Sequence, residues 1–290
     1  MTHLIGYSFA PGGLATNGLL QSAGPTVSWS SAFGSFDYKA AVRAACRKWA
    51  DVCDVEFCEV TDPGVSINAG TVGMQRMFLG PIDGASGLNV VANATPPGGL
   101  PFSGNILYDS DATDINFLAT GYMLSVTVHE MGHAVFGMLH NTTDSVMNGI
   151  GNDTPTAYDR QLATATHGAA KSLSAKVGSG SLIGQIYSAY KGAYDITVSN
   201  DDLFYWYRQI ATNTNTFATL CTAMAGSYAP SRVWLQSLYT RVLGRSGSSA
   251  EIDAWIATGK NCGQILKDFA ESVEAANRRA SLFASGLWFS

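Results

Sequence analysis

Residues 126–149 contain the pattern His-Glu-x-x-His, formed by His129, Glu130 and His133. In an α-helix, residues four positions apart lie on the same face, so the two imidazoles can bind a single metal ion. Glu130 falls on the adjacent face, where its carboxylate can hydrogen-bond a water on that metal without binding the metal itself. This segment constrains the fold strongly, because it must be helical and must present both histidines to one point.

The residues after this helix supply a third ligand. Gly137 is predicted to end the helix in the left-handed conformation, so that the chain turns back and brings in His140. Three neutral imidazoles and a water complete a catalytic zinc site. Asp144 is the alternative third ligand. On its own the pattern also fits an ordinary helix with solvated histidines, but Gly137, His140 and the later Met147 together favour the metal site.

The segment resembles the metzincin zinc metallopeptidases, whose pattern is H-E-x-x-H-x-x-G-x-x-H followed by a Met-turn. One residue more precedes Gly137 here than in that pattern. An added helical residue rotates the rest of the segment by about 100° and advances it by about 1.5 Å, which a π-bulge can absorb. The resemblance implies a zinc-dependent endopeptidase in which Glu130 activates a zinc-bound water. It also implies that Met147 forms an apolar floor under the metal.

Residues 89–99 resemble the edge strand and following loop that receive the substrate in the matrixin branch of the metzincins. An exposed edge offers unpaired N–H and C=O groups to an extended peptide. The resemblance therefore implies peptide binding by five residues of the strand, which are Val90, Val91, Ala92, Asn93 and Ala94. Without the metal motif, the same stretch is an ordinary edge strand that stops at two prolines. Matrixins place a histidine for a second zinc where this chain has Asn93, so we expect one zinc.

Three carboxylates follow the next expected strand, at Asp109, Asp111 and Asp114. Calcium takes six to eight oxygen ligands, and these residues are a candidate calcium site. The run lacks the twelve-residue calcium loop with its glycine and terminal glutamate, so a solvated acidic turn is an equal alternative.

The pattern of apolar residues predicts an α/β (α+β) fold for the first part of the chain, because helix, strands and metal-binding helix follow in turn. The resemblance implies a twisted, mostly parallel sheet. The expected strands are residues 5–9, 26–30, 55–60, 65–68 and 104–110, and the expected helices are residues 37–52, 123–136 and 158–166.

We expect a metzincin-like peptidase domain at residues 1–168, a small polar linker at 169–181 and an all-α domain at 182–290. The all-α part contains two weak repeats, each with a capping-box-like start, Ser199-x-x-Asp202 and Ser248-x-x-Glu251. The second repeat resembles a helical domain of unknown function found in bacterial exported proteins. The aromatic residues of the all-α part fall at helical spacing and are expected to lie mostly in the core. These are Tyr187, Tyr190, Trp206, Trp234 and Trp255. A docking role at a surface or assembly is left open for this domain.

Composition limits the partners and the location. Charged residues make up 13% of the chain, about half the usual share, which suits a secreted or particle-associated protein of bacterial or phage origin. The net charge is −5 without a basic run, so we expect no nucleic-acid partner. No apolar run is long enough to span a membrane, and the N-terminus lacks the features of a cleaved signal peptide.

Two functions fit these observations. The first is a zinc endopeptidase with a protein or peptide substrate. The alternative is a catalytically silent peptidase-fold module that binds or builds a surface or phage-type assembly. The complete His129, Glu130 and His133 set favours the enzyme.

Overall fold

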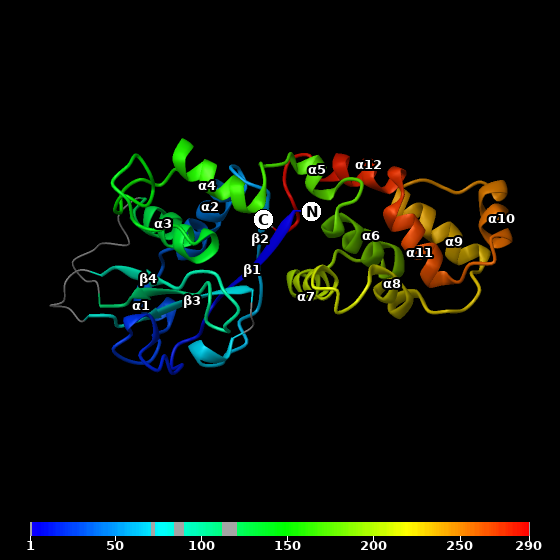
Figure 1. The fold of residues 1–290 in the computed structure, drawn as a ribbon. Helices are drawn as coiled ribbons and strands as arrows, with labels where there is room; N and C mark the ends of the chain where they lie inside the picture. Colours follow the sequence, from blue (N-terminus) through cyan, green and yellow to red (C-terminus); the bar gives the residue numbers. More distant parts are fainter. Residues whose placement is uncertain (1, 71–72, 84–89, 112–120, 290) are drawn as a thin grey trace. The chain divides into compact units, whose positions relative to one another are not determined.

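The computed structural model describes residues 2–70, 73–83, 90–111 and 121–289, which form two compact units (Figure 1). The N-terminal unit is Ile5–Ala170, and the helical unit is Lys171–Phe289 together with residues 2–4. The segment 169–181, expected as a linker, contains helix α5 (Leu173–Val177), which packs against α12 (Val273–Leu282).

The N-terminal unit is built on a five-stranded sheet with the strand order β2-β1-β3-β5-β4. Strands β1, β3 and β5 are parallel to one another, whereas β4 pairs antiparallel with β5 and lies at one edge, so the prediction of a mostly parallel sheet is confirmed. The strands are β1 (His3–Phe9), β2 (Val55–Glu59), β3 (Met74–Gly80), β4 (Ala92–Ala94) and β5 (Ile106–Asp109).

Two helices, α2 (Tyr38–Ala50) and α3 (Tyr122–Phe136), pack against each other in the main core of this unit. Asp37 caps α2 by accepting the N–H of Ala40 at 2.9 Å. Val42, Cys46 and Trp49 form an apolar stripe on α2 and are buried. The indole Nε1 of Trp49 donates to the carbonyl of Val128 in α3 at 3.1 Å. This hydrogen bond ties α2 to the metal-binding helix α3. A further helix, α4 (Ala157–His167), follows close to its predicted place.

Two predicted strands are wrong. In residues 26–30, Val27 donates one N–H to Leu79, but the chain then enters the short helix α1 (Trp29–Phe33), where Trp29 stacks on Phe33. Residues 65–68 lead into a 3₁₀ turn, η2 (Ile67–Ala69), and a second such turn is η1 (Leu19–Gln21). The carbonyls of Val65 and Ser66 accept from the buried guanidinium of Arg76 at 2.8 and 3.1 Å, and this bonding replaces a strand ladder.

The helical unit contains α5, α12 and a series of helices between them (Figure 1). These are α6 (Leu182–Tyr194), α7 (Asn200–Ala211), α8 (Phe217–Ala225), α9 (Arg232–Leu238), the π-helical turn η3 (Tyr239–Leu243), α10 (Ser249–Ala257) and α11 (Cys262–Glu271). Ser199 caps α7 and Ser248 caps α10, as their sequence patterns predict. Among the expected core aromatics, Tyr187 and Tyr190 are buried, and Trp206, Trp234 and Trp255 are partly exposed.

A buried arginine joins three parts of the helical unit. The guanidinium of Arg279 donates to the carbonyls of Val177 and Ala270 at 2.7 and 2.9 Å and to the hydroxyl of Ser188 at 2.7 Å.

Across the described ranges of both units, no helix is long and apolar enough to cross a membrane.

Candidate metal centre

Helix α3 carries His129 and His133 one turn apart on its last two turns and ends at Gly137. Gly137 has φ 64° and ψ 23°, the left-handed conformation predicted for the helix stop. Beyond it the chain reverses, and His140 reaches back to the two helical histidines.

The extra residue before Gly137 is absorbed at the end of the helix. The N–H of Gly137 is shared between the carbonyls of Gly132 and His133, and the N–H of Met138 donates to Gly132 at 3.0 Å. The last turn is therefore widened, while α3 stays α-helical through Phe136. The anticipated π-bulge within the helix does not occur, and the widened turn carries His140 to the other two rings.

The Nε2 atoms of the three histidines converge. Nε2 of His140 lies 3.0 Å from Nε2 of His129 and 3.1 Å from Nε2 of His133. Bonds of about 2.0–2.1 Å to a tetrahedral zinc place ligand nitrogens about 3.3 Å apart, close to these separations. Asp144 is exposed and is not a member of this group.

The second nitrogen of each helical ring is held by the backbone. Nδ1 of His129 lies 2.8 Å from the carbonyl oxygen of Val146, and Nδ1 of His133 lies 2.6 Å from that of Met138. A carbonyl only accepts, so each Nδ1 carries the proton and each Nε2 presents a lone pair to the common point. One N–H of His140 can satisfy only one of these lone pairs, whereas a metal cation satisfies all three. The donor set thus fits zinc.

Burial keeps the helical imidazoles neutral. It lowers the pKa of His129 to about 4, and the other two histidines add to this effect. The pKa of His133 is lowered by burial and by His140. Neutral rings bind a cation without first losing a proton, so two ligands are ready at neutral pH. His140 is exposed, which marks the side from which a substrate can approach.

Glu130 is buried beside these ligands. Glu130 is 4% exposed, and its Oε2 atom has no hydrogen-bond partner within the described part of the chain. Burial raises the pKa of this carboxyl to about 8. A buried carboxylate oxygen left without a donor has unused capacity to accept a proton.

Met147 lies directly under the metal-binding turn and is fully buried. A Cβ atom added to Gly132 would overlap the Sδ atom of Met147. Glycine at position 132 therefore lets the methionine pack against the helix backbone between the two helical histidines. The role of Met147 as an apolar floor under a metal stays a prediction.

Residues 26–164 match the family model described as Matrixin. The match and the three converging histidines fit a matrixin-like metzincin domain. The match covers strands β2 to β5, α3, the three histidines and most of α4, whereas β1 lies before it. It supports a zinc metallopeptidase at the level of the family. No curated protein matches the chain closely enough to count as a relative.

One residue that positions the matrixin-like site was missed in the sequence. The carboxylate of Asp159, in α4, accepts from the hydroxyl of Ser145 at 2.5 Å and from the N–H of Val146 at 3.0 Å. Ser145 Oγ in turn accepts the N–H of Met147 at 2.9 Å. Asp159 thus holds the turn whose Val146 carbonyl orients His129. The only signal in the sequence is the capping-box pattern that Asp159 forms with Thr156.

The expected substrate strand lies beside α3 at the edge of the sheet. The carbonyl of Val91 accepts from the N–H of Asp109, and the N–H of Thr95 donates to the carbonyl of Asn105, both at 2.9 Å. Because hydrogen bonding alternates along an antiparallel pair, the backbone groups of Ala92 and Ala94 point to the free edge. Val90 packs against a smaller core, and Asn93 is partly exposed.

The structure describes two of the three candidate calcium ligands. Asp109 is buried, and its Oδ1 accepts from the N–H groups of Ile82 and Asp111, each at 3.0 Å. Burial raises the pKa of Asp109, and the nearby Asp111 and Asp83 add to the effect. Asp114 lies outside the described residues. Calcium at this position stays a prediction.

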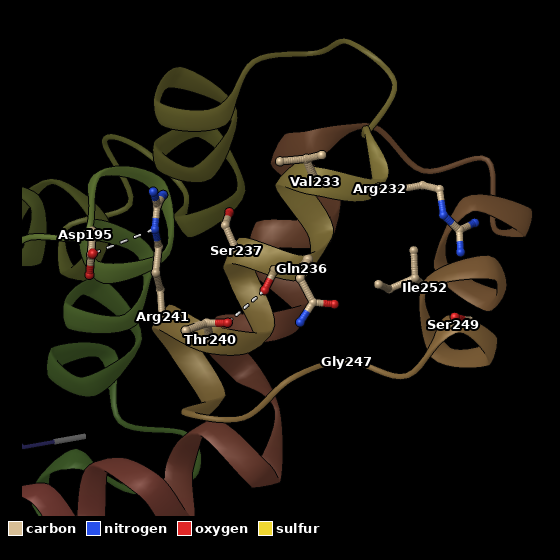
Figure 2. Close-up of a pocket in the computed structure, with 10 residues that line it drawn as sticks. All are labelled: Asp195, Arg232, Val233, Gln236, Ser237, Thr240, Arg241, Gly247, Ser249 and Ile252. Carbon is tan, nitrogen blue, oxygen red and sulfur yellow. Dashed lines mark hydrogen bonds and ion pairs between the residues drawn. The ribbon is translucent and has the colours of Figure 1, made fainter.

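A separate hollow of about 610 Å³ lies in the helical unit between α9, η3 and α10 (Figure 2). Arg241 on one wall pairs with Asp195, and Arg232 on the other wall pairs with Asp253. Val233 projects at the rim and is 81% exposed. The described residues that line this hollow include no histidine or cysteine, so it lacks the chemistry of the metal centre.

Proposed function

We propose that the protein is a zinc-dependent endopeptidase in which Glu130 acts as the general base. The observation that supports this proposal is the convergence of three Nε2 atoms beside a buried carboxylate oxygen that has no described partner. His129, His133 and His140 would hold the metal, with Met147 packed beneath.

Each group has a defined part in the proposed reaction. Zinc held at this site would acidify a water toward a pKa of about 7 and polarise the scissile carbonyl. Glu130 would take the proton from the attacking water at its carboxylate and pass it to the leaving amine. The hydrogen bonds from Nδ1 of His129 and His133 keep the rings in one tautomer and one orientation throughout.

The substrate would bind as an additional strand. The backbone groups of Ala92 and Ala94 are directed to the free edge of β4, and α3 packs against the same strand. An extended peptide that pairs with this edge is bound through its backbone, which tolerates varied sequences, while side-chain pockets add selectivity. Residues 90–94 are therefore proposed as the substrate-binding strand.

Removal and return of the metal test the proposal. Protein treated with a chelator should lose cleavage of casein, and one equivalent of zinc per chain should restore it. Magnesium should not restore activity, because three imidazoles are poor ligands for a hard cation. Full activity in the metal-free protein would refute the proposal. Zinc-loaded protein that cleaves neither casein nor a mixed peptide library would instead favour the silent binding module.

We further propose an extracellular or particle-associated location, with the helical unit serving for attachment. The low share of charged residues supports the location, and the open hollow between α9 and α10 supports a docking role (Figure 2). Fractionation of the producing cells tests the location. The protein should bind to the cell-surface fraction through its helical unit. Val233→Asp, at the exposed rim of the hollow, should weaken that binding.

A further inference from the structure

Leu139 lies between the helix stop and the third metal-ligand candidate, and 78% of its surface is exposed. Single exposed leucines are common on protein surfaces and by themselves indicate nothing. Leu139 differs because the backbone on both sides of it is fixed by the metal centre itself.

The preceding residue, Met138, is buried and is held at both backbone groups. Its N–H donates to Gly132 at 3.0 Å, and its carbonyl accepts from Nδ1 of His133 at 2.6 Å. The following residue, His140, is held by the other two imidazoles. The backbone on both sides of Leu139 is therefore held in place, and its exposed side chain lies next in sequence to the third histidine of the site.

The turn that carries Leu139 also touches the end of the proposed substrate strand. A Cβ atom on Gly137 would lie 3.5 Å from Cδ of Pro97, which follows β4. Leu100, in the same loop as Pro97, is 55% exposed. The turn 137–140 thus extends from the C-terminal end of β4 to the metal centre on the exposed side.

A peptide bound antiparallel to β4 would place its N-terminal half beside the C-terminal end of β4. Antiparallel pairing is slightly more stable per residue than parallel pairing. The residues before the scissile bond would then pass the turn 137–140.

We propose that Leu139 is a specificity-determining residue that selects an apolar side chain on the N-terminal side of the scissile bond. This inference rests on the proposed endopeptidase function. Contact with Leu139 removes apolar surface of both partners from water, so peptides with leucine or phenylalanine at one of these positions should be cleaved faster. The presence or absence of one apolar side chain in such a contact changes kcat/KM by about 10-fold.

The test uses peptides of one parent sequence, varied to leucine, alanine or serine at each of the three positions before the scissile bond. Zinc-loaded wild type should prefer leucine to alanine by about 10-fold in kcat/KM at one position. In Leu139→Ala this ratio should fall to about 2-fold or less. The matched control is Leu162→Ala, which removes a leucine exposed by 37% on α4 and should keep the wild-type ratio.

Two outcomes overturn the inference in different ways. If Leu139→Ala keeps the wild-type preference at all three positions, or changes it only after the scissile bond, Leu139 is not the selecting residue, and the endopeptidase function stands. If zinc-loaded wild type cleaves none of the peptides and no casein, the proposed function fails, and the inference falls with it.

Discussion

Nδ1 of His129 lies 2.8 Å from the carbonyl oxygen of Val146, the residue immediately before Met147. This hydrogen bond ties a metal-facing ring to the turn under the site. The same turn is held by Asp159 through the N–H of Val146. The direction of the His129 lone pair therefore depends on a carboxylate that belongs to another helix.

Replacement of Asp159 should weaken zinc binding. Asp159→Asn cannot accept the same set of hydrogen bonds from Ser145, Val146 and Thr156, so the turn and His129 lose their fixed position. We expect a loss of about 10–100-fold in zinc affinity, measured by competition with a chelating dye. Asp144→Asn, at an exposed carboxylate nearby, is the control and should bind zinc as wild type does. Unchanged affinity in a folded Asp159→Asn protein would contradict the positioning role.

Gly132→Ala should destabilise the N-terminal unit. The added methyl group overlaps Sδ of Met147, which is buried and cannot leave freely. Overpacking of this kind costs about 1–3 kcal/mol in the free energy of unfolding, measured by urea denaturation. Gly99→Ala, where the new methyl group meets nothing within 4 Å, should cost less than about 1 kcal/mol. Equal losses in the two variants would argue against close packing of Met147 on the helix.

The third ligand position is tested by a pair of variants. His140→Ala removes one of three converging nitrogens and should lower zinc affinity by several orders of magnitude, whereas Asp144→Ala should leave it unchanged. Zinc affinity can be measured by titration against a chelator of known strength. The opposite order would mean that Asp144 takes the third position in solution, despite the place of His140 after the widened turn.

The ion pair between Asp62 and Arg76 should make stability depend on pH. Burial disfavours the charged form of Asp62, but hydrogen bonds from Arg76, Ser8 and the N–H of Gly64 outweigh it and hold the pKa below its usual value. A pKa lowered by folding stabilises the protein above the unfolded value of about 3.9, and this contribution is lost as the pH falls through the lower folded value.

Asp62→Asn should therefore lower the free energy of unfolding by about 3–5 kcal/mol at pH 7, because it leaves the buried Arg76 without its partner. The difference in the free energy of unfolding between the variant and wild type should become smaller below about pH 4. Urea denaturation at several pH values measures it. Asp153→Asn breaks a half-exposed pair with Lys48 and should cost less than about 1 kcal/mol. A loss for Asp62→Asn that stays constant down to pH 2 would contradict the lowered pKa.

The local parts of the site were predictable from the sequence. The spacing of His129 and His133 follows from helix geometry, and the left-handed stop at Gly137 follows from the properties of glycine. The fate of the extra residue did not follow, because either a bulge in the helix or a widened last turn accommodates it. The hydrogen bonds from the N–H groups of Gly137 and Met138 to the carbonyl of Gly132 identify the widened turn.

The remaining parts depend on contacts that no local pattern contains. Asp159 is buried because a turn earlier in the chain donates to it. The apolar residues at 65–68 have the pattern of a strand, yet Arg76 takes the carbonyls that a neighbouring strand would use. Buried charged side chains form hydrogen bonds with backbone groups, and the spacing of apolar residues does not predict which groups they bind.

The most direct test of the central claim is casein cleavage by wild type and Glu130→Gln, with the zinc content of both proteins measured in the same samples. Glutamine keeps the shape of the side chain but cannot take a proton, so the variant should hold one zinc per chain and lose about 10²–10⁴-fold in rate. A Glu130→Gln protein that carries zinc and cleaves casein at the wild-type rate would contradict the proposed role of Glu130.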